Sequence, residues 1–230
     1  HSFLNIKHSF TLAEVLITLV IIGIIAAITV PMIMANHKKT EYSARLKKFY
    51  SQMNNAVKLA ETEWGIPTYE WDYTLDSKTF FEQYLSKYVN CEIKEVNDGD
   101  ESSFGWGKEF SFSHACYLND GTFFAFESSS YSETSKMMTF LYDLNGWKKP
   151  NKEGADEFYF SIGLAGPADG LFESNLCHGF SPIGLDECQD ISGGGDREYL
   201  KRNCKSNVWS CSALLFLDGW EFKDDYPYRL

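Results

Sequence analysis

Residues 10–30 read FTLAEVLITLVIIGIIAAITV and are followed by Pro31. Glu14 is the one charged residue in this apolar stretch. As an α-helix the stretch rises about 30 Å, which matches the hydrocarbon core of a bilayer. A secretory signal peptide has a shorter apolar core and ends at a small-residue cleavage site, whereas here the polar continuation ANHKKTEYSARLKK keeps helical periodicity. We therefore predict a membrane-spanning helix that continues beyond the apolar stretch.

The continuation of this helix is predicted to be amphipathic. Its apolar residues recur at steps of three and four, which is typical of a helix with one buried face. The helix is expected to end near Trp64-Gly65-Ile66-Pro67, because glycine and proline terminate helices. Pro31 is expected to kink it, since proline removes one backbone donor and crowds the preceding turn. The predicted buried face consists of Tyr42, Leu46, Phe49, Tyr50, Met53, Val57 and Ala60.

The remaining chain mixes helix and strand patterns. A second helix is predicted within residues 76–89, and residues 92–109 are predicted to form an acidic, glycine-containing loop. The turn Asn119-Asp120-Gly121 separates strand patterns at 115–118 and 122–126, which indicates a hairpin. Residues 138–143 and 157–162 are expected to form another strand pair. The fold class is therefore α+β, with a long N-terminal helix packed on an antiparallel sheet.

Net charge argues against nucleic-acid binding, and the lack of known motifs argues against catalysis. The chain carries 32 acidic residues against 21 lysines and arginines, a formal net charge of −11. An acidic surface repels phosphate backbones, so nucleic acid is not the expected ligand. His114 and His178 are the only histidines beyond the long helix, and neither lies in a known catalytic motif. There is also no P-loop or dinucleotide fingerprint, so we expect no catalytic residues and no enzyme.

The cysteines all follow the apolar stretch. None of them is spaced C-x-x-C, the usual zinc or redox signal. An even number on one side of a membrane anchor favours disulfides formed in an oxidising compartment. Six cysteines allow 15 connectivities, among which we favour the three local pairs, while buried free thiols in a cytosolic protein are the alternative. The pairs are Cys91–Cys116, Cys177–Cys188 and Cys204–Cys211.

The string SFTLAEVLITL at residues 9–19 resembles the cleavage and methylation motif of prepilins, which type IV pilins and type II secretion pseudopilins share. In that family a peptidase cuts before a phenylalanine and methylates the new amine. The fifth mature residue is a glutamate and the twenty-second is often a proline. Counted from Phe10, these are Glu14 and Pro31. Ser9 stands where the family usually has glycine, which leaves the efficiency of cleavage open.

The resemblance implies a division of the chain and a set of partners. Residues 1–9 would be a leader peptide, 10–30 the transmembrane and filament-core helix, 31–65 its amphipathic continuation and 66–230 a periplasmic or extracellular domain. The partners would be pilin subunits, the prepilin peptidase, an inner-membrane assembly platform and the lipid bilayer. Glu14 would neutralise the amine of Phe10 in a neighbouring subunit. The alternative for Thr11-x-x-Glu14 is a capping box at a plain signal anchor.

Three functions remain open at this point. The first is a type II secretion-like pseudopilin or minor pilin, and the second is a major pilin of a surface fibre. The third, from another class, is a signal-anchored periplasmic domain for binding or adhesion. The basic residues that follow the apolar helix would by themselves place the large domain in the cytoplasm. The motif and the cysteines favour the opposite orientation, with a single inner-membrane span and the domain outside.

Two further stretches have alternative interpretations. The loop DLNGWKKPNKEGAD at residues 143–156 carries oxygen ligands and glycines, a combination that suits calcium. It loosely resembles calcium-binding loops of some pseudopilins. Otherwise it is a long polar turn. The tail from Asp218 is either a contact surface or a final strand and turn whose aromatic residues cover the core. The calcium ligands would be Asp143, Asn145, Asn151 and Asp156, and no other cofactor is expected.

Overall fold

The computed structural model describes residues 11–96, 112–130, 136–146, 148, 151–163, 179–183 and 196–230. Helix α1 (Leu12–Trp64) continues through Pro31 and ends before Gly65, whose φ of +68° favours glycine. The chain divides into two compact units, His1–Lys39 and Thr40–Leu230. Every buried residue of α1 lies in the second unit. The predicted long helix with one buried stripe in its second half is confirmed.

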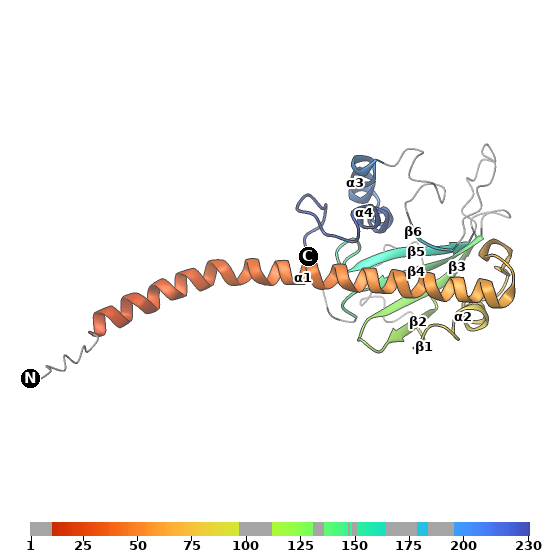
Figure 1. The fold of residues 1–230 in the computed structure, drawn as a ribbon, viewed down its shortest axis with the longest axis horizontal. Helices are drawn as coiled ribbons and strands as arrows, with labels where there is room; N and C mark the ends of the chain where they lie inside the picture. Colours follow the sequence, from red (N-terminus) through yellow and green to blue (C-terminus); the bar gives the residue numbers. More distant parts are fainter. Residues whose placement is uncertain are drawn as a thin grey trace, which may run out of the picture. The chain divides into compact units, whose positions relative to one another are not determined.

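Within the described residues, the sheet in the second unit has six antiparallel strands in sequence order. Figure 1 shows the second half of α1 running along one face of this sheet. The predicted hairpin around Asp120 is confirmed, as is the predicted pair formed by the fourth and fifth strands. The strands are β1 (Cys91–Glu95), β2 (His114–Leu118), β3 (Phe123–Ser130), β4 (Lys136–Asp143), β5 (Glu157–Gly163) and β6 (Phe180–Pro182).

Strand β1 corrects the predicted loop at 92–109, at least for its first residues. Ile93 and Cys91 are half-buried, whereas Glu92, Lys94 and Glu95 are exposed. This alternation suits an edge strand, where charged side chains protect the open edge from pairing with other chains. The charges therefore belong to a strand with one solvated face rather than to a loop. Residues 97–109, the remainder of that prediction apart from Val96, lie outside the described residues.

Aromatic side chains fill the core between α1 and the sheet. Phe49 of α1 lies against Phe124, Tyr142, Phe160 and Phe180, each from a different strand. Helix α2 (Ser77–Tyr84) adds its own aromatic residues, and its N-terminus is capped by Asp76, which accepts a hydrogen bond from the backbone of Thr79. Such a cap satisfies a backbone donor that the helix itself leaves unpaired. A smaller cluster covers the opposite face of the sheet.

The tail from Asp218, for which a final strand and turn was one interpretation, follows a series of helices. Helix α3 (Arg197–Ser206) is followed by the short helices η5 (Val208–Ser210) and α4 (Cys211–Leu217). Gly219 and Trp220 have φ values of +69° and +68°. Two successive left-handed residues end the helix and cannot continue as an extended strand. The prediction of a final strand is therefore wrong, although Trp220 and Phe222 do cover the core as expected.

Candidate functional site

The N-terminal half of α1 presents apolar side chains around its whole circumference. The large hydrophobic residues from Leu12 to Met34 each expose at least 43% of their surface. One 18-residue window of the helix has a mean hydropathy of 2.8, and none of that window is buried. A helix that is apolar all round needs an apolar environment, which a bilayer provides. By length and composition this segment therefore fits a single-pass membrane anchor.

Thr11 and Glu14 form a reciprocal cap at the start of this helix. The backbone N–H and the hydroxyl of Thr11 both donate to Glu14 Oε2, at 2.8 and 2.9 Å. The backbone N–H of Glu14 donates to Thr11 Oγ1 at 3.3 Å. The capping box considered from the sequence is thus present. Oε1 takes part in none of these bonds, so the cap and a pairing with an amine would use different oxygens. Ser9 and Phe10 lie outside the described residues.

The connection between β4 and β5 brings together three of the four residues considered for calcium. The backbone N–H of Asn145 donates to Asp143 Oδ1 at 2.8 Å, and its side-chain Nδ2 donates to Asp156 Oδ2 at 2.7 Å. The other oxygen of Asp156 accepts from the backbone N–H of Lys152. Asn151, the fourth residue, directly precedes Lys152 and has a left-handed φ of +41°. The end of β4 and the connection that follows it therefore gather these polar side chains.

Burial sets this connection apart from an ordinary polar turn. Asp143 is 0% exposed, Asp156 1% and Asn151 8%. Asp143 Oδ2, Asn145 Oδ1 and Asn151 Oδ1 are buried oxygens without a hydrogen-bond partner. Burial, with a smaller contribution from the nearby charge of Asp156, raises the pKa of Asp143 to about 7. Leaving buried oxygens without a donor costs free energy, and a hard cation is one partner that would satisfy them.

Glu157 is a residue that the sequence analysis did not single out. It is 0% exposed and lies directly opposite Asp143 in the β4–β5 register. Its side chain therefore projects from the same face of the sheet as that of Asp143, since directly paired residues do so. Among the described residues, no group of three or more His, Cys, Asp or Glu side chains is spaced to hold a metal ion. A cation in this connection would therefore depend on amide and backbone oxygens as well as carboxylates.

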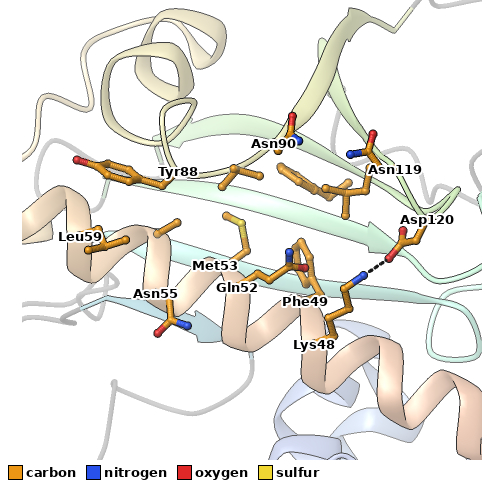
Figure 2. A pocket seen from close by; sticks show the side chains of 14 residues that line it. Lys48, Phe49, Gln52, Met53, Asn55, Leu59, Tyr88, Asn90, Asn119 and Asp120 are labelled. Atoms are coloured by element: carbon orange, nitrogen blue, oxygen red, sulfur yellow. Dashed lines mark hydrogen bonds and ion pairs between the residues drawn. The ribbon is translucent and has the colours of Figure 1, made fainter.

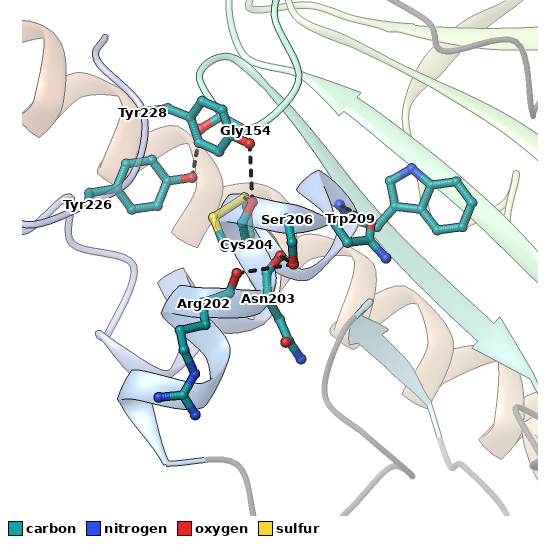
Figure 3. Close-up of a disulfide and its surroundings, with 10 residues drawn as sticks. Gly154, Arg202, Asn203, Cys204, Ser206, Trp209, Tyr226 and Tyr228 are labelled. Carbon is teal, nitrogen blue, oxygen red and sulfur yellow. Dashed lines mark hydrogen bonds between the residues drawn. A yellow bond between two sulfur atoms is a disulfide. The ribbon is translucent and has the colours of Figure 1, made fainter.

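The C-terminal tail lies over the same connection (Figure 3). The hydroxyl of Tyr226 donates to the backbone oxygen of Gly154 at 2.6 Å, and that of Tyr228 donates to the backbone oxygen of Cys204 at 3.2 Å. A Cβ at Gly154 would meet the ring of Tyr228 at 2.8 Å. Gly154, with a φ of +75°, is thus needed for both its conformation and this close approach.

Two disulfides among the described residues each cross-link neighbouring elements of the domain. The structure joins Cys91 to Cys116 and Cys204 to Cys211, with Cα atoms 5.5 and 4.5 Å apart. The first links neighbouring strands β1 and β2, and the second links α3 to the start of α4. These are two of the three local pairs favoured from the sequence. Cys177 and Cys188 lie outside the described residues.

His114 lies beside two serines, but the arrangement is not that of a catalytic triad. Its Nδ1 is 2.9 Å from Ser113 Oγ and 3.4 Å from Ser77 Oγ. Glu127 accepts hydrogen bonds from the hydroxyl and the backbone N–H of Ser113. In a triad the acid orients the histidine, and the histidine activates the nucleophile. Here the acid binds the serine, so the cluster ties α2 to β2 and β3.

A groove of about 500 Å³ lies between α1, the residues before β1 and the β2–β3 hairpin. Figure 2 shows the Lys48 ammonium at one end, hydrogen-bonded to Asp120 Oδ2 at 2.6 Å. The lining mixes amide and apolar side chains and includes none of the candidate site residues from the sequence. Besides Lys48 and Asp120, it includes Phe49, Gln52, Met53, Asn55, Asn90, Asn119 and Phe124.

Two known family models match this chain, one at the N-terminal segment and one over the rest. A model described as a family of unknown function (DUF6613) matches residues 32–230, and one described as the prokaryotic N-terminal methylation motif matches residues 4–30. No curated protein and no solved structure matches the chain. The methylation motif covers the apolar part of α1 and the capped Glu14. The chain thus belongs to the DUF6613 family, and its N-terminus is that of a type IV pilin-like prepilin.

Proposed function

We propose that this prepilin is a filament subunit, either a type II secretion-like pseudopilin or a minor pilin. The observation that carries the proposal is the methylation motif on a helix whose large apolar side chains are exposed in the single subunit. In a bilayer those side chains contact lipid, and in a filament they contact the same helices of neighbouring subunits. The subunit is expected to leave the membrane sideways into a periplasmic or surface filament.

Processing precedes assembly in this proposal. A prepilin peptidase cuts between Ser9 and Phe10 and methylates the new amine. Glu14 then pairs with the amine of Phe10 in a neighbouring subunit and sets the axial stagger. A carboxylate at the bilayer centre costs roughly 2.5–3.5 kcal/mol, and less near the interface. The intramolecular cap and the intermolecular pairing together would offset that cost, and the domain would lie outside the inner membrane.

The capping box favours a second candidate, a signal-anchored periplasmic domain that binds or adheres. In that case Glu14 has all the partners it needs within its own helix, and no filament is formed. A major pilin of a surface fibre is a third option, within the first class. The neighbouring genes would separate secretion from a surface fibre, because an adjacent secretion ATPase and secretin favour secretion.

Intact mass of the membrane-extracted protein tests the processing step. The expected mass corresponds to a chain that begins at Phe10 with one added methyl group. The same measurement in a strain without the peptidase should return the unprocessed chain. A protein that keeps residues 1–9 in both strains is an anchored domain and not a filament subunit.

A further inference from the structure

We propose that residues 225–230 of the C-terminal tail form a strap that seals the Cys204–Cys211 disulfide against thiol reagents. Reduction of this disulfide then requires that the strap first detaches from the β4–β5 connection and from α3. The proposal concerns contacts within one subunit, so it does not depend on the filament function. It makes the end of the chain responsible for whether this disulfide exchanges with thiols.

The sulfur atoms of this disulfide lie beneath the strap and the β4–β5 connection. Cys204 and Cys211 are each 0% exposed. A Cβ added at Gly154 would lie 2.8 Å from two ring carbons of Tyr228 and 3.2 Å from Cys211 Sγ. The connection, the ring and the sulfur therefore meet at one point (Figure 3). Loss of the ring would uncover the connection beside the sulfur.

Two tyrosine hydroxyls hold the strap in place. The hydroxyl of Tyr228 donates to the backbone oxygen of Cys204 at 3.2 Å, so the strap bonds to a disulfide-bearing residue itself. The hydroxyl of Tyr226 donates to the backbone oxygen of Gly154 at 2.6 Å. The ammonium of Lys152 lies 5.7 Å from the centroid of the Tyr228 ring, within the range of a cation–π contact. The ring of Tyr228 is thus fixed to both the disulfide and the connection.

The start of the strap is tied to α3, the helix that carries Cys204. The carboxylate of Asp225 accepts two hydrogen bonds from Arg197, at 2.6 and 2.8 Å, and one from Lys201 at 2.8 Å. Ion pairs that are partly exposed contribute little to stability and weaken in salt. Chain ends also open more readily than a core. The strap is therefore expected to detach without unfolding of the whole domain.

Thiol–disulfide exchange requires access to a sulfur atom. A thiolate of the reductant attacks one cysteine sulfur, forms a mixed disulfide with it and releases the other cysteine as a thiolate. With a dithiol, the second thiolate then displaces the remaining cysteine, so the dithiol becomes a cyclic disulfide. The two cysteine thiolates take up protons from water. The first attack does not occur while both sulfurs are buried, so the reduction rate reports how often the strap detaches.

The test follows each disulfide separately in the full chain in detergent. Samples treated with dithiothreitol are quenched with iodoacetamide at intervals, and peptide mass spectrometry measures the alkylation of each cysteine. The Cys91–Cys116 disulfide is the reference, because Cys91 is half-buried on edge strand β1 and none of the strap contacts described above involves β1 or β2. It should be reduced about tenfold faster than Cys204–Cys211. Equal rates, or faster reduction of Cys204–Cys211, overturn the seal.

Tyr228→Ala tests the strap itself. It removes the ring that lies against Gly154, so it should raise the reduction rate of the sealed disulfide about tenfold and leave the reference disulfide unchanged. Tyr228→Phe loses only the hydroxyl and should produce a smaller increase. Arg229→Ala, at an exposed position of the same strap, is the matched control and should behave as the wild type. Unchanged reduction in Tyr228→Ala, or equal acceleration at both disulfides, overturns the strap.

Discussion

The ring of Phe49 on α1 stacks on the ring of Tyr142 on β4, with centroids 3.9 Å apart and planes 5° apart. Three further aromatic rings surround Phe49, so it joins the helix to most of the sheet. Stacked aromatic pairs contribute beyond the area they bury. The attachment of α1 to its domain therefore depends more on this residue than on any charge pair of the helix.

Phe49→Ala is expected to lower the free energy of unfolding by about 3–5 kcal/mol, because it leaves a cavity at the centre of the core. Urea denaturation of the detergent-solubilised chain, followed by tryptophan fluorescence, measures this loss. Leu59→Ala on the same helix is the control. Leu59 is 53% exposed, so its truncation should change the free energy by only about 0.5 kcal/mol. Equal losses in the two variants would contradict the central role of Phe49.

Glu14→Gln is expected to leave the folded domain intact but to prevent incorporation into filaments. The neutral amide cannot neutralise the amine of a neighbouring subunit. Thr11→Val is the matched variant, because it removes the hydroxyl that bonds Glu14 and keeps the carboxylate. Co-purification of each variant with assembled filament measures incorporation. If Thr11→Val fails as completely as Glu14→Gln, capping and not pairing is the role of the carboxylate.

The two described disulfides should differ in their effect on stability. Cys91 and Cys116 are 25 residues apart, whereas Cys204 and Cys211 are 7 apart. The longer loop restricts the unfolded chain more, so replacing the first pair by alanine should cost about 3–4 kcal/mol and the second about 2–3 kcal/mol. Urea denaturation under non-reducing conditions compares them. A larger loss from the second pair would show that its packing against the tail outweighs loop entropy.

An ion-pair network on α3 predicts a dependence on pH. Arg197, and then Lys201, hold the pKa of Asp225 well below its usual range by hydrogen bonding to its carboxylate. A carboxylate with a depressed pKa stabilises the fold above its unfolded pKa of about 3.9, and this contribution disappears as the pH falls towards the folded value.

Asp225→Asn should therefore lower the melting temperature at pH 7, and the difference from wild type should shrink as the pH drops below about 4. Since the side chain of Asp225 is 45% exposed, the effect at neutral pH should be small and should weaken in high salt. Glu221→Gln removes one negative charge from an exposed position of the same tail and serves as the control. A difference that is constant from pH 7 to pH 2 would mean that the ion pairs do not stabilise the fold.

Local patterns predicted most of the fold. The helical spacing of Leu46, Phe49 and Met53 and the turn at Asp120 can each be recognised from a short stretch of sequence, without knowledge of tertiary contacts. Strand β1 was missed because the charges of Glu92 and Glu95 outweighed the alternation around Ile93. The charges are compatible with a strand only at the edge of a sheet, and edge position depends on the pairing of distant residues.

The candidate site was predictable only in part, for the same reason. Asp143, Asn145 and Asp156 lie within one connection, so their proximity followed from the expected pairing of β4 with β5. Their burial did not, since it depends on what packs around the connection. The contact of Tyr226 with Gly154 joins residues 72 positions apart. No periodicity or motif indicates such a contact.

The order of the sheet also bears on how the domain forms during synthesis. Each strand pairs with the next strand in the chain, from β1 to β6. The stripe of α1 that begins at Tyr42 is made before any of them. Each strand from β2 onward can therefore pair with a strand that has already been synthesised and pack on a helix that is already present. No strand depends on a partner far away in the sequence. Such nearest-neighbour pairing keeps loop closure short, which limits the time that unpaired edges are available to other chains.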